Sequence, residues 1–115
     1  MYSEDMADAC VFLMNLPDAQ FSKLLESDEA GAGMFSPPMV NIGVGYDRTI
    51  ANLADLVKRA VGYQGAITFD TTKADGTPRK LLDVSRLTGL GWQASTPFEQ
   101  GLASTYESFL SRWAK

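Results

Sequence analysis

The spacing of apolar side chains predicts a helix at the start of the chain and a short second helix after it. Ser3 is a suitable N-cap, and Glu4 and Asp5 suit the positively charged first turn. The apolar face consists of Met6, Cys10, Leu13 and Met14. Pro17 ends this helix, and residues 18–25 have the pattern of the second.

The clearest amphipathic pattern lies in the middle of the chain. Thr49 predicts the N-cap of a helix, and Gly62 predicts its left-handed end. Lys58 and Arg59 suit the negatively charged C-terminal turn. The apolar stripe between the two ends consists of Ile50, Leu53, Ala54, Val57 and Val61.

The last helix has the strongest start signal. Thr96, Pro97 and Glu99 suit an N-cap, a first-turn proline and a capping-box glutamate. The apolar repeat that follows consists of Phe98, Leu102, Tyr106, Phe109 and Trp113. A shorter helix is predicted over residues 84–90.

Two short apolar segments, 39–43 and 66–69, have the pattern of strands. Residues 26–38 are rich in small residues and proline and predict a loop or insertion, and residues 70–80 predict a polar loop. The fold class is therefore α/β, with few strands and about four helices, over a single domain of residues 1–115. Two strands make a thin sheet that normally needs partners, so we expect part of the fold to lie outside this chain.

The composition is that of an ordinary globular domain, with 115 residues, 45% hydrophobic and 21% charged. No apolar run approaches the roughly 20 residues of a membrane span, and the N-terminus lacks a signal-peptide pattern. These features predict no membrane partner. A single cysteine excludes an intramolecular disulfide and fits a reducing compartment, so the expected location is cytoplasmic.

The net charge of −4 is unevenly distributed. Residues 1–38 carry seven acidic side chains against one lysine, whereas residues 39–115 carry seven acidic side chains against nine basic ones. An acidic chain without a basic stripe argues against a nucleic-acid partner. The mildly basic second part suits one small phosphate-bearing ligand.

The residues for catalysis are missing. Histidine is absent, which excludes a catalytic triad, a histidine base and a histidine-rich metal site. Cys10 on an apolar helix face is expected to be buried and unreactive, and Glu4, Asp5 and Asp8 are expected to form a solvated first turn. We predict no catalytic residue and no metal site in this chain.

The residues for holding a redox cofactor are missing too. Gly43-Val44-Gly45 begins like a dinucleotide fingerprint, but Arg48 stands where the third glycine belongs. A plain strand-to-helix turn is the better interpretation. No tyrosine is followed four residues later by a lysine, which is the acid–base pair of short-chain reductases. We expect no cofactor bound by this chain.

One charged segment stands out. Lys73, Asp75, Arg79 and Lys80 surround a turn that Pro78 stiffens. Cations suit phosphate oxygens, and a carboxylate accepts hydrogen bonds from sugar or ribose hydroxyls. From the residues alone, a ligand site and an ordinary charged surface loop are equally consistent with this pattern.

The run Asp75 to Leu87, followed by Leu90-Gly91-Trp92, closely resembles the C-terminal region of GDP-L-fucose synthases, members of the extended short-chain dehydrogenase/reductase family. Shorter matches are Glu4 to Ala9, Asn41 to Gly45, Thr49-Ile50 with Leu53-Ala54, and Gly101 to Tyr106. The resemblance covers nearly the whole chain except about residues 18–38. Its most specific part is the sequence Asp-Gly-Thr-Pro-Arg-Lys-Leu-Leu-Asp.

The resemblance implies a small C-terminal substrate-binding domain without the N-terminal Rossmann domain. Such enzymes convert GDP-4-keto-6-deoxy-D-mannose to GDP-L-fucose with NADPH, and their cofactor loop and catalytic groups lie in the N-terminal part. By match to the motif, Asp75 is expected to contact the substrate, with Arg79 and Lys80 near its phosphates. Upstream substrate-binding residues of the family are missing, so this chain alone should bind a GDP-sugar weakly and be inactive.

Two alternatives stay open. In the first alternative, the parent protein is a related nucleotide-sugar epimerase or dehydratase, because these residues do not indicate which base is recognised. In the second alternative, the chain is a non-catalytic interaction module whose last helix faces a partner through Thr105, Tyr106, Phe109 and Trp113. Without a Rossmann domain to cover its apolar surface, the chain is expected to self-associate as a homo-oligomer or to be only modestly stable.

Overall fold

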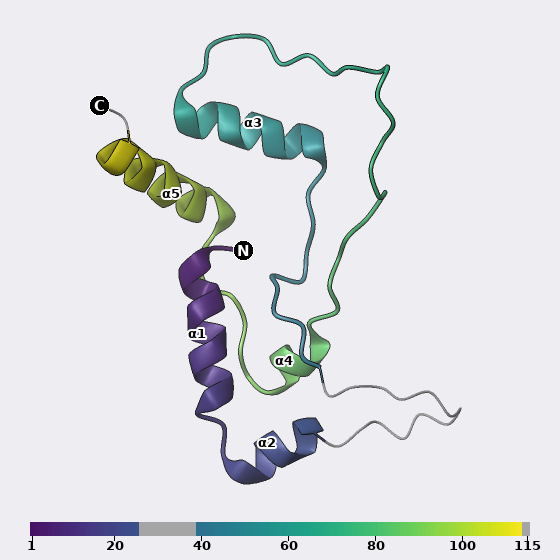
Figure 1. Ribbon diagram of the computed structural model, residues 1–115, viewed down its shortest axis with the longest axis vertical. Helices are drawn as coiled ribbons and strands as arrows, with labels where there is room; N and C mark the ends of the chain where they lie inside the picture. Colours follow the sequence, from purple (N-terminus) through teal and green to yellow (C-terminus); the bar gives the residue numbers. More distant parts are fainter. Residues whose placement is uncertain (26–38, 114–115) are drawn as a thin grey trace.

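The computed structural model describes residues 1–25 and 39–113, and the loop predicted at 26–38 lies outside these residues (Figure 1). The helices are α1 (Ser3–Met14), α2 (Asp18–Leu25), α3 (Ile50–Val61), α4 (Ser85–Gly89) and α5 (Phe98–Trp113). They match the helices that the apolar pattern predicts. Long extended segments, residues 39–49 and 62–84, lie on either side of α3, and the molecule measures 53 × 37 × 21 Å.

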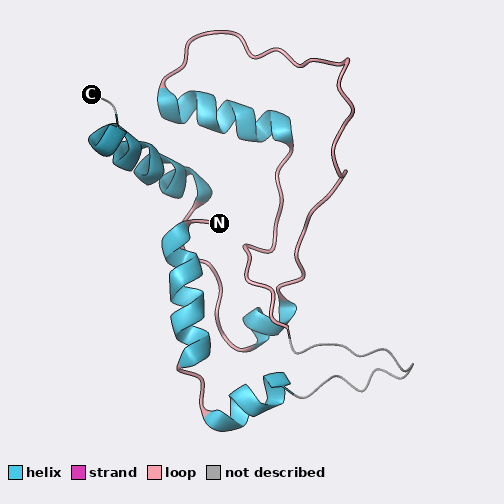
Figure 2. Ribbon diagram, viewed as in Figure 1, coloured by secondary structure: helices cyan, strands magenta, loops and turns pink. Residues whose placement is uncertain are grey.

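The predicted strands are wrong for the part of the chain that the structure describes. Segments 39–43 and 66–69 contain no strand, and Figure 2 shows them as loop. Segment 39–43 lies beside residues 82–84, and the hydrogen bond between them is made by the side-chain amide of Asn41, which donates to the carbonyl oxygen of Asp83 at 3.0 Å. Strands are stable only when their backbone groups are paired, and these segments have no paired neighbour within the described residues.

The local signals around α3 are confirmed. The hydroxyl of Thr49 accepts a hydrogen bond from the amide of Asn52 at 3.1 Å, as an N-cap should. Gly62 ends the helix at φ 69°, in the left-handed region where glycine has no steric cost.

The face of α3 that packs is not its apolar stripe. Helix α3 contacts α5, and Leu56 is the buried residue at this contact, 5% exposed. Val57, in the middle of the stripe, is 39% exposed. The stripe instead lines an open apolar groove of about 410 Å³ together with Tyr63 and Ile67. The most amphipathic helix of the chain thus leaves its apolar side uncovered.

Helix α1 also turns a different face inward than the pattern predicts. Its buried residues are Asp5 and Ala9, whereas Met6 and Met14 are exposed. Cys10 is exposed as well, so its predicted burial is wrong. Ser3 is the first helical residue, not the cap; the N-cap is Tyr2, which makes no side-chain cap bond. Two carboxylates on the inward face decide this orientation, as described below.

A small core joins α1 to α4. Ala9, Leu87 and Trp92 form its buried centre, and it is surrounded by the partly buried side chains of Phe12, Leu13, Val40, Ile42 and Ala94. Leu87 is fully enclosed, so α4 is held by packing despite its short length. No helix within residues 1–25 and 39–113 is long and apolar enough to cross a membrane.

Candidate functional site

The charged segment singled out in the sequence lies on the extended connection from α3 to α4, and residues 71–80 are all exposed (Figure 1). At its start, Asp70 accepts hydrogen bonds from the hydroxyl of Thr72 at 2.6 Å and from its amide at 3.0 Å. The hydroxyl bond, followed by the amide bond, lowers the pKa of Asp70 below its usual 3.8. Asp70, at the start of the segment, therefore keeps its negative charge to a lower pH than an ordinary aspartate.

Arg79 is held by an ion pair. Its Nε donates to Oδ2 of Asp47 at 2.9 Å, which ties the charged segment to the turn before α3. Both side chains are well exposed, so the pair contributes at most about 1 kcal/mol. The pair therefore orients Arg79 more than it stabilises the fold.

Lys80, one of the predicted site residues, lines a cavity. This cavity, which we call the lysine cavity, has a volume of about 510 Å³ and is bounded by Tyr2, the 42–46 turn and Leu82. Asp75 is not among its lining residues and lies on the exposed loop. The structure therefore brings Arg79 and Lys80 to the 42–47 turn but does not bring Asp75 to the same place.

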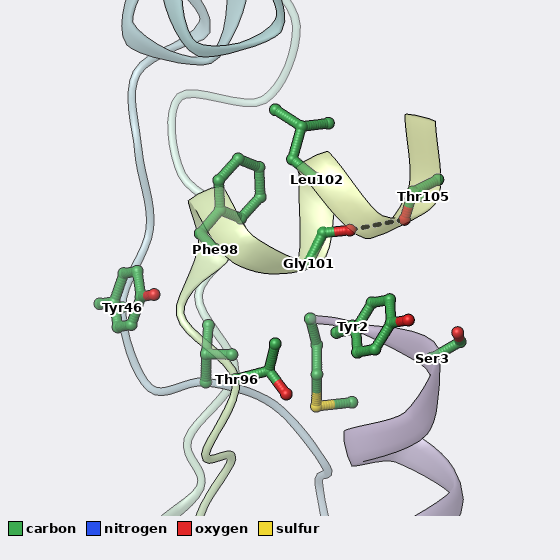
Figure 3. A pocket seen from close by; sticks show the side chains of 10 residues that line it. Tyr2, Ser3, Tyr46, Thr96, Phe98, Gly101, Leu102 and Thr105 are labelled. Carbon is green, nitrogen blue, oxygen red and sulfur yellow. Dashed lines mark hydrogen bonds between the residues drawn. The ribbon is translucent and has the colours of Figure 1, made fainter. Parts of the chain in front are cut away.

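A second cavity adjoins the first. We call it the aromatic cavity; its volume is about 340 Å³, and Figure 3 shows the rings of Tyr2, Tyr46 and Phe98 around it. Thr96, Gly101, Leu102 and Thr105 complete the wall. The two cavities share Met1, Tyr2, Ser3, Val44 and Tyr46 as lining residues. They are neighbouring parts of one hollow between α1, α5 and the turn before α3.

Arg48 fixes two of these rings. Its guanidinium carbon lies 5.5 Å from the ring centre of Tyr46 and 5.2 Å from that of Phe98, within the range of a cation–π contact. The same side chain pairs with Glu99 at 3.3 Å and donates to Oδ1 of Asn52 at 3.2 Å. Glu99 is thus paired with Arg48, which is not the capping-box role predicted for it.

The buried carboxylate of Asp5 fixes the start of α5. It is 5% exposed and accepts hydrogen bonds from the amides of Ser95 and Thr96 at 3.3 Å and from the hydroxyl of Thr96 at 3.0 Å. The prediction of a solvated first turn is wrong for this residue. An acceptor far away in sequence satisfies amides just before the helix, which local patterns do not reveal.

Asp8 has a similar role one turn later. Its Oδ2 accepts a hydrogen bond from the indole nitrogen of Trp92 at 2.7 Å. A buried indole N–H needs such a partner, and Asp8 supplies it while remaining exposed itself, as predicted. Together with Asp5, it explains why α1 turns its acidic side inward and leaves Cys10 and Met14 in solvent.

The glycine-rich turn does not fit a dinucleotide. A Cβ at Gly43 would lie 3.3 Å from the side chain of Val84, and one at Gly45 would lie 3.1 Å from it. The close approach that these glycines permit is therefore used by Val84, not left open for a pyrophosphate. Within the described ranges, no group of three or more Cys, His, Asp or Glu residues is placed to hold a metal ion.

The chain is similar to part of several known proteins. No family model matches the chain. It is 45% identical to a GDP-L-fucose synthase of Sinorhizobium fredii over 99% of its length, and 44% identical to that of Escherichia coli over 96%. The chain is a homologue of the C-terminal part of GDP-L-fucose synthases. It spans about 30% of the length of these relatives, namely 31% and 32%.

A solved structure of a reductase is also similar to the chain. A crystal structure of a GDP-6-OMe-4-keto-L-xylo-heptose reductase from C. jejuni superposes with a TM-score of 0.81 at 29% identity. The match covers 97% of this chain and 30% of that protein. The fold is therefore that of a segment of a short-chain-type reductase.

Proposed function

We propose that this chain is the nucleotide-sugar-binding part of an NADPH-dependent epimerase-reductase that makes GDP-L-fucose from GDP-4-keto-6-deoxy-D-mannose. The observation that carries the proposal is the 44–45% identity to GDP-L-fucose synthases over 96–99% of the chain. The catalytic groups and the NADPH site of the parent protein would lie in sequence outside these 115 residues. The chain alone would be inactive. The parent protein would be located in the cytoplasm.

The residues proposed to hold the substrate differ in charge, and each would bind a different part of the substrate. Lys80, at the lysine cavity, would attract the phosphate oxygens as a mobile point charge. Arg79 uses its Nε for Asp47, and its two terminal nitrogens would donate to phosphate oxygens. Asp75, on the exposed loop, would accept hydrogen bonds from sugar or ribose hydroxyls.

The parent protein would supply a further domain that covers this chain. The apolar groove along α3 and the exposed apolar side of α1 are the surfaces that such a domain would bury. Neighbouring exposed apolar side chains of this kind are typical of an interface. Binding of a GDP-sugar by the chain alone would be weak, because that domain would contribute part of the site.

The names of the similar proteins agree on the nucleotide of the substrate and differ in its sugar. The C. jejuni structure belongs to a reductase of a GDP-heptose, whereas the sequence relatives are GDP-L-fucose synthases. GDP is common to both names. The alternative is a related GDP-sugar enzyme, which would share the guanine nucleotide but act on a different sugar.

Titration calorimetry with GDP-L-fucose and with sulfate tests the proposal. We expect heat of binding for GDP-L-fucose only, and about tenfold weaker binding in Asp75→Asn, because one hydrogen bond to a charged group is lost. Asp55→Asn is the matched control, since Asp55 is an exposed carboxylate on α3. Equal responses to GDP-L-fucose and sulfate would refute binding by this chain.

One observation favours a second candidate, the non-catalytic interaction module. On α5, Tyr106 stacks on Phe109 at 6.3 Å between ring centres, and Phe109 and Trp113 are 53% and 75% exposed. Such aromatic side chains are typical anchors of a protein interface. A chain that ignores guanine nucleotides but loses partner binding in Trp113→Ala would support this candidate.

A further inference from the structure

Helix α1 is apolar on two opposite sides, and one of them is exposed. The covered side, with Ala9, Phe12 and Leu13, packs into the core. The other side has a stripe of exposed residues at positions i, i+3, i+4 and i+7, namely Ala7, Cys10, Val11 and Met14. Residues at this spacing share one face of a helix. The same spacing is typical of the anchors of an amphipathic helix that binds in a groove.

The apolar groove along α3 has a stripe with matching spacing. Its lining residues at positions i, i+3, i+4 and i+7 are Ile50, Leu53, Ala54 and Val57. Helices α1 and α3 each have 12 residues, so the two stripes are also equal in length. An antiparallel helix with the spacing of α1 therefore matches the groove position by position.

Charge favours one of the two directions in which such a helix could lie. Helix α1 has no basic residue, and Glu4 is exposed at its start. Lys58 lines the groove toward the C-terminal end of α3. An antiparallel helix places Glu4 toward Lys58, whereas a parallel helix places Glu4 toward Asp47, before the start of α3. Antiparallel packing is therefore favoured by the ion pair and by the opposed helix dipoles.

We propose that α1 of one copy of this chain binds antiparallel in the α3 groove of a second copy. In this arrangement Cys10 lies opposite Ala54, and Val11 lies opposite Leu53. A second copy is the occupant because it provides a helix with the spacing, length and charge that suit the groove. The further domain proposed for the parent protein would compete for both surfaces, so this contact belongs to the chain without that domain.

Two variants that each remove one surface test the contact when they are mixed. Val11→Lys places a charge on the α1 stripe, and Val57→Lys places one in the groove. Each should lower the association constant in analytical ultracentrifugation at least tenfold, because a charge is costly in an apolar contact. An equal mixture should regain association, since one variant keeps the groove and the other keeps the α1 stripe. Gln20→Lys adds the same charge on exposed α2 and is the control.

Cross-linking tests the register of the two helices. Cys10 is the only cysteine of the chain, so Ala54→Cys adds a single second thiol. Mild oxidation should give a dimer on a non-reducing gel, with a disulfide that mass spectrometry assigns to positions 10 and 54. Ala51→Cys, at an exposed position of α3 outside the groove, should give little of this dimer. The additional change Cys10→Ser should remove the link.

Four results would overturn the proposal. Association that is unchanged in Val11→Lys would mean that α1 is not the occupant, and a mixture that stays monomeric would mean that the two surfaces do not meet. A disulfide that joins two copies of Cys10 would indicate pairing of α1 with α1. An unsubstituted chain that stays monomeric would leave both surfaces to the further domain of the parent protein. Circular dichroism shows that each variant folds.

Discussion

Single carboxylates decide how the ends of this chain meet. Asp5 is buried and accepts hydrogen bonds from Ser95 and Thr96, about 90 residues away in sequence. We expect Asp5→Ala to lower the free energy of unfolding by roughly 2–3 kcal/mol, because the amides before α5 lose a charged acceptor in a buried place. Urea unfolding measures this effect. Glu4→Ala, one residue away and exposed, should change it by less than about 0.5 kcal/mol.

Two other carboxylates make stability depend on acidity. The amide and then the hydroxyl of Ser85 lower the pKa of Asp83, as the hydroxyl and amide of Thr72 lower that of Asp70. A folded-state pKa below the unfolded 3.8 gives stabilisation that is complete above that pH and is lost as the pH falls through the folded value. We therefore expect stability to fall on acidification below about pH 4, and to fall less steeply in Asp83→Asn.

Thermal unfolding between pH 2 and 6 checks this dependence. Asp55→Asn serves as the control, since it removes one exposed carboxylate outside these two turns. An identical pH profile in Asp83→Asn and the unsubstituted chain would contradict the assignment.

At the scale of elements, the two sides of α3 should respond differently to truncation. Leu56 is buried against α5, so Leu56→Ala should lower the free energy of unfolding by about 2–4 kcal/mol. Val57→Ala, in the exposed stripe, should cost less than about 1 kcal/mol, since little surface is buried there and alanine favours helix. Equal losses in urea unfolding would mean that the stripe is covered in solution.

The sequence predicts elements well where the signal is local and poorly where a partner is needed. Thr49 and Gly62 mark the ends of α3 because each acts on its own helix. Segments 39–43 and 66–69 have the residues of strands, but a strand forms only against another strand. The inward face of α1 depends on Asp5 and its partners near α5, so no window of neighbouring residues predicts it.

The candidate site divides in the same way. Lys80 was predicted by resemblance, and the structure places it at a cavity. The roles of Asp75, Arg79 and Lys80 in binding stay predictions. Arg48 and the rings around it were missed, because the rings lie on separate elements that only the fold brings together. Arg48 is two residues from Tyr46 but fifty from Phe98, so no local pattern signals its contact with both rings.

For the whole molecule, the uncovered apolar surface should drive self-association. The groove along α3 is open and apolar, and the exposed side of α1 adds further methionine and valine side chains. We expect the sedimentation coefficient to rise with concentration in the unsubstituted chain and to rise less in Val57→Lys. Ala51→Lys adds the same charge on an exposed position outside the groove and should behave like the unsubstituted chain. A chain that stays monomeric at all concentrations would show that the groove does not mediate self-association.

Chemical-shift mapping of the ¹⁵N-labelled chain with GDP-L-fucose tests whether this chain holds a guanine nucleotide sugar. We expect saturable shifts in residues 75–80 and in the turn that carries Tyr46. The last turn of α5, which includes Trp113, should not shift. Two results would contradict nucleotide-sugar binding and favour the interaction module. In one, the shifts are confined to α5. In the other, GDP-L-fucose causes no shifts, as sulfate does not.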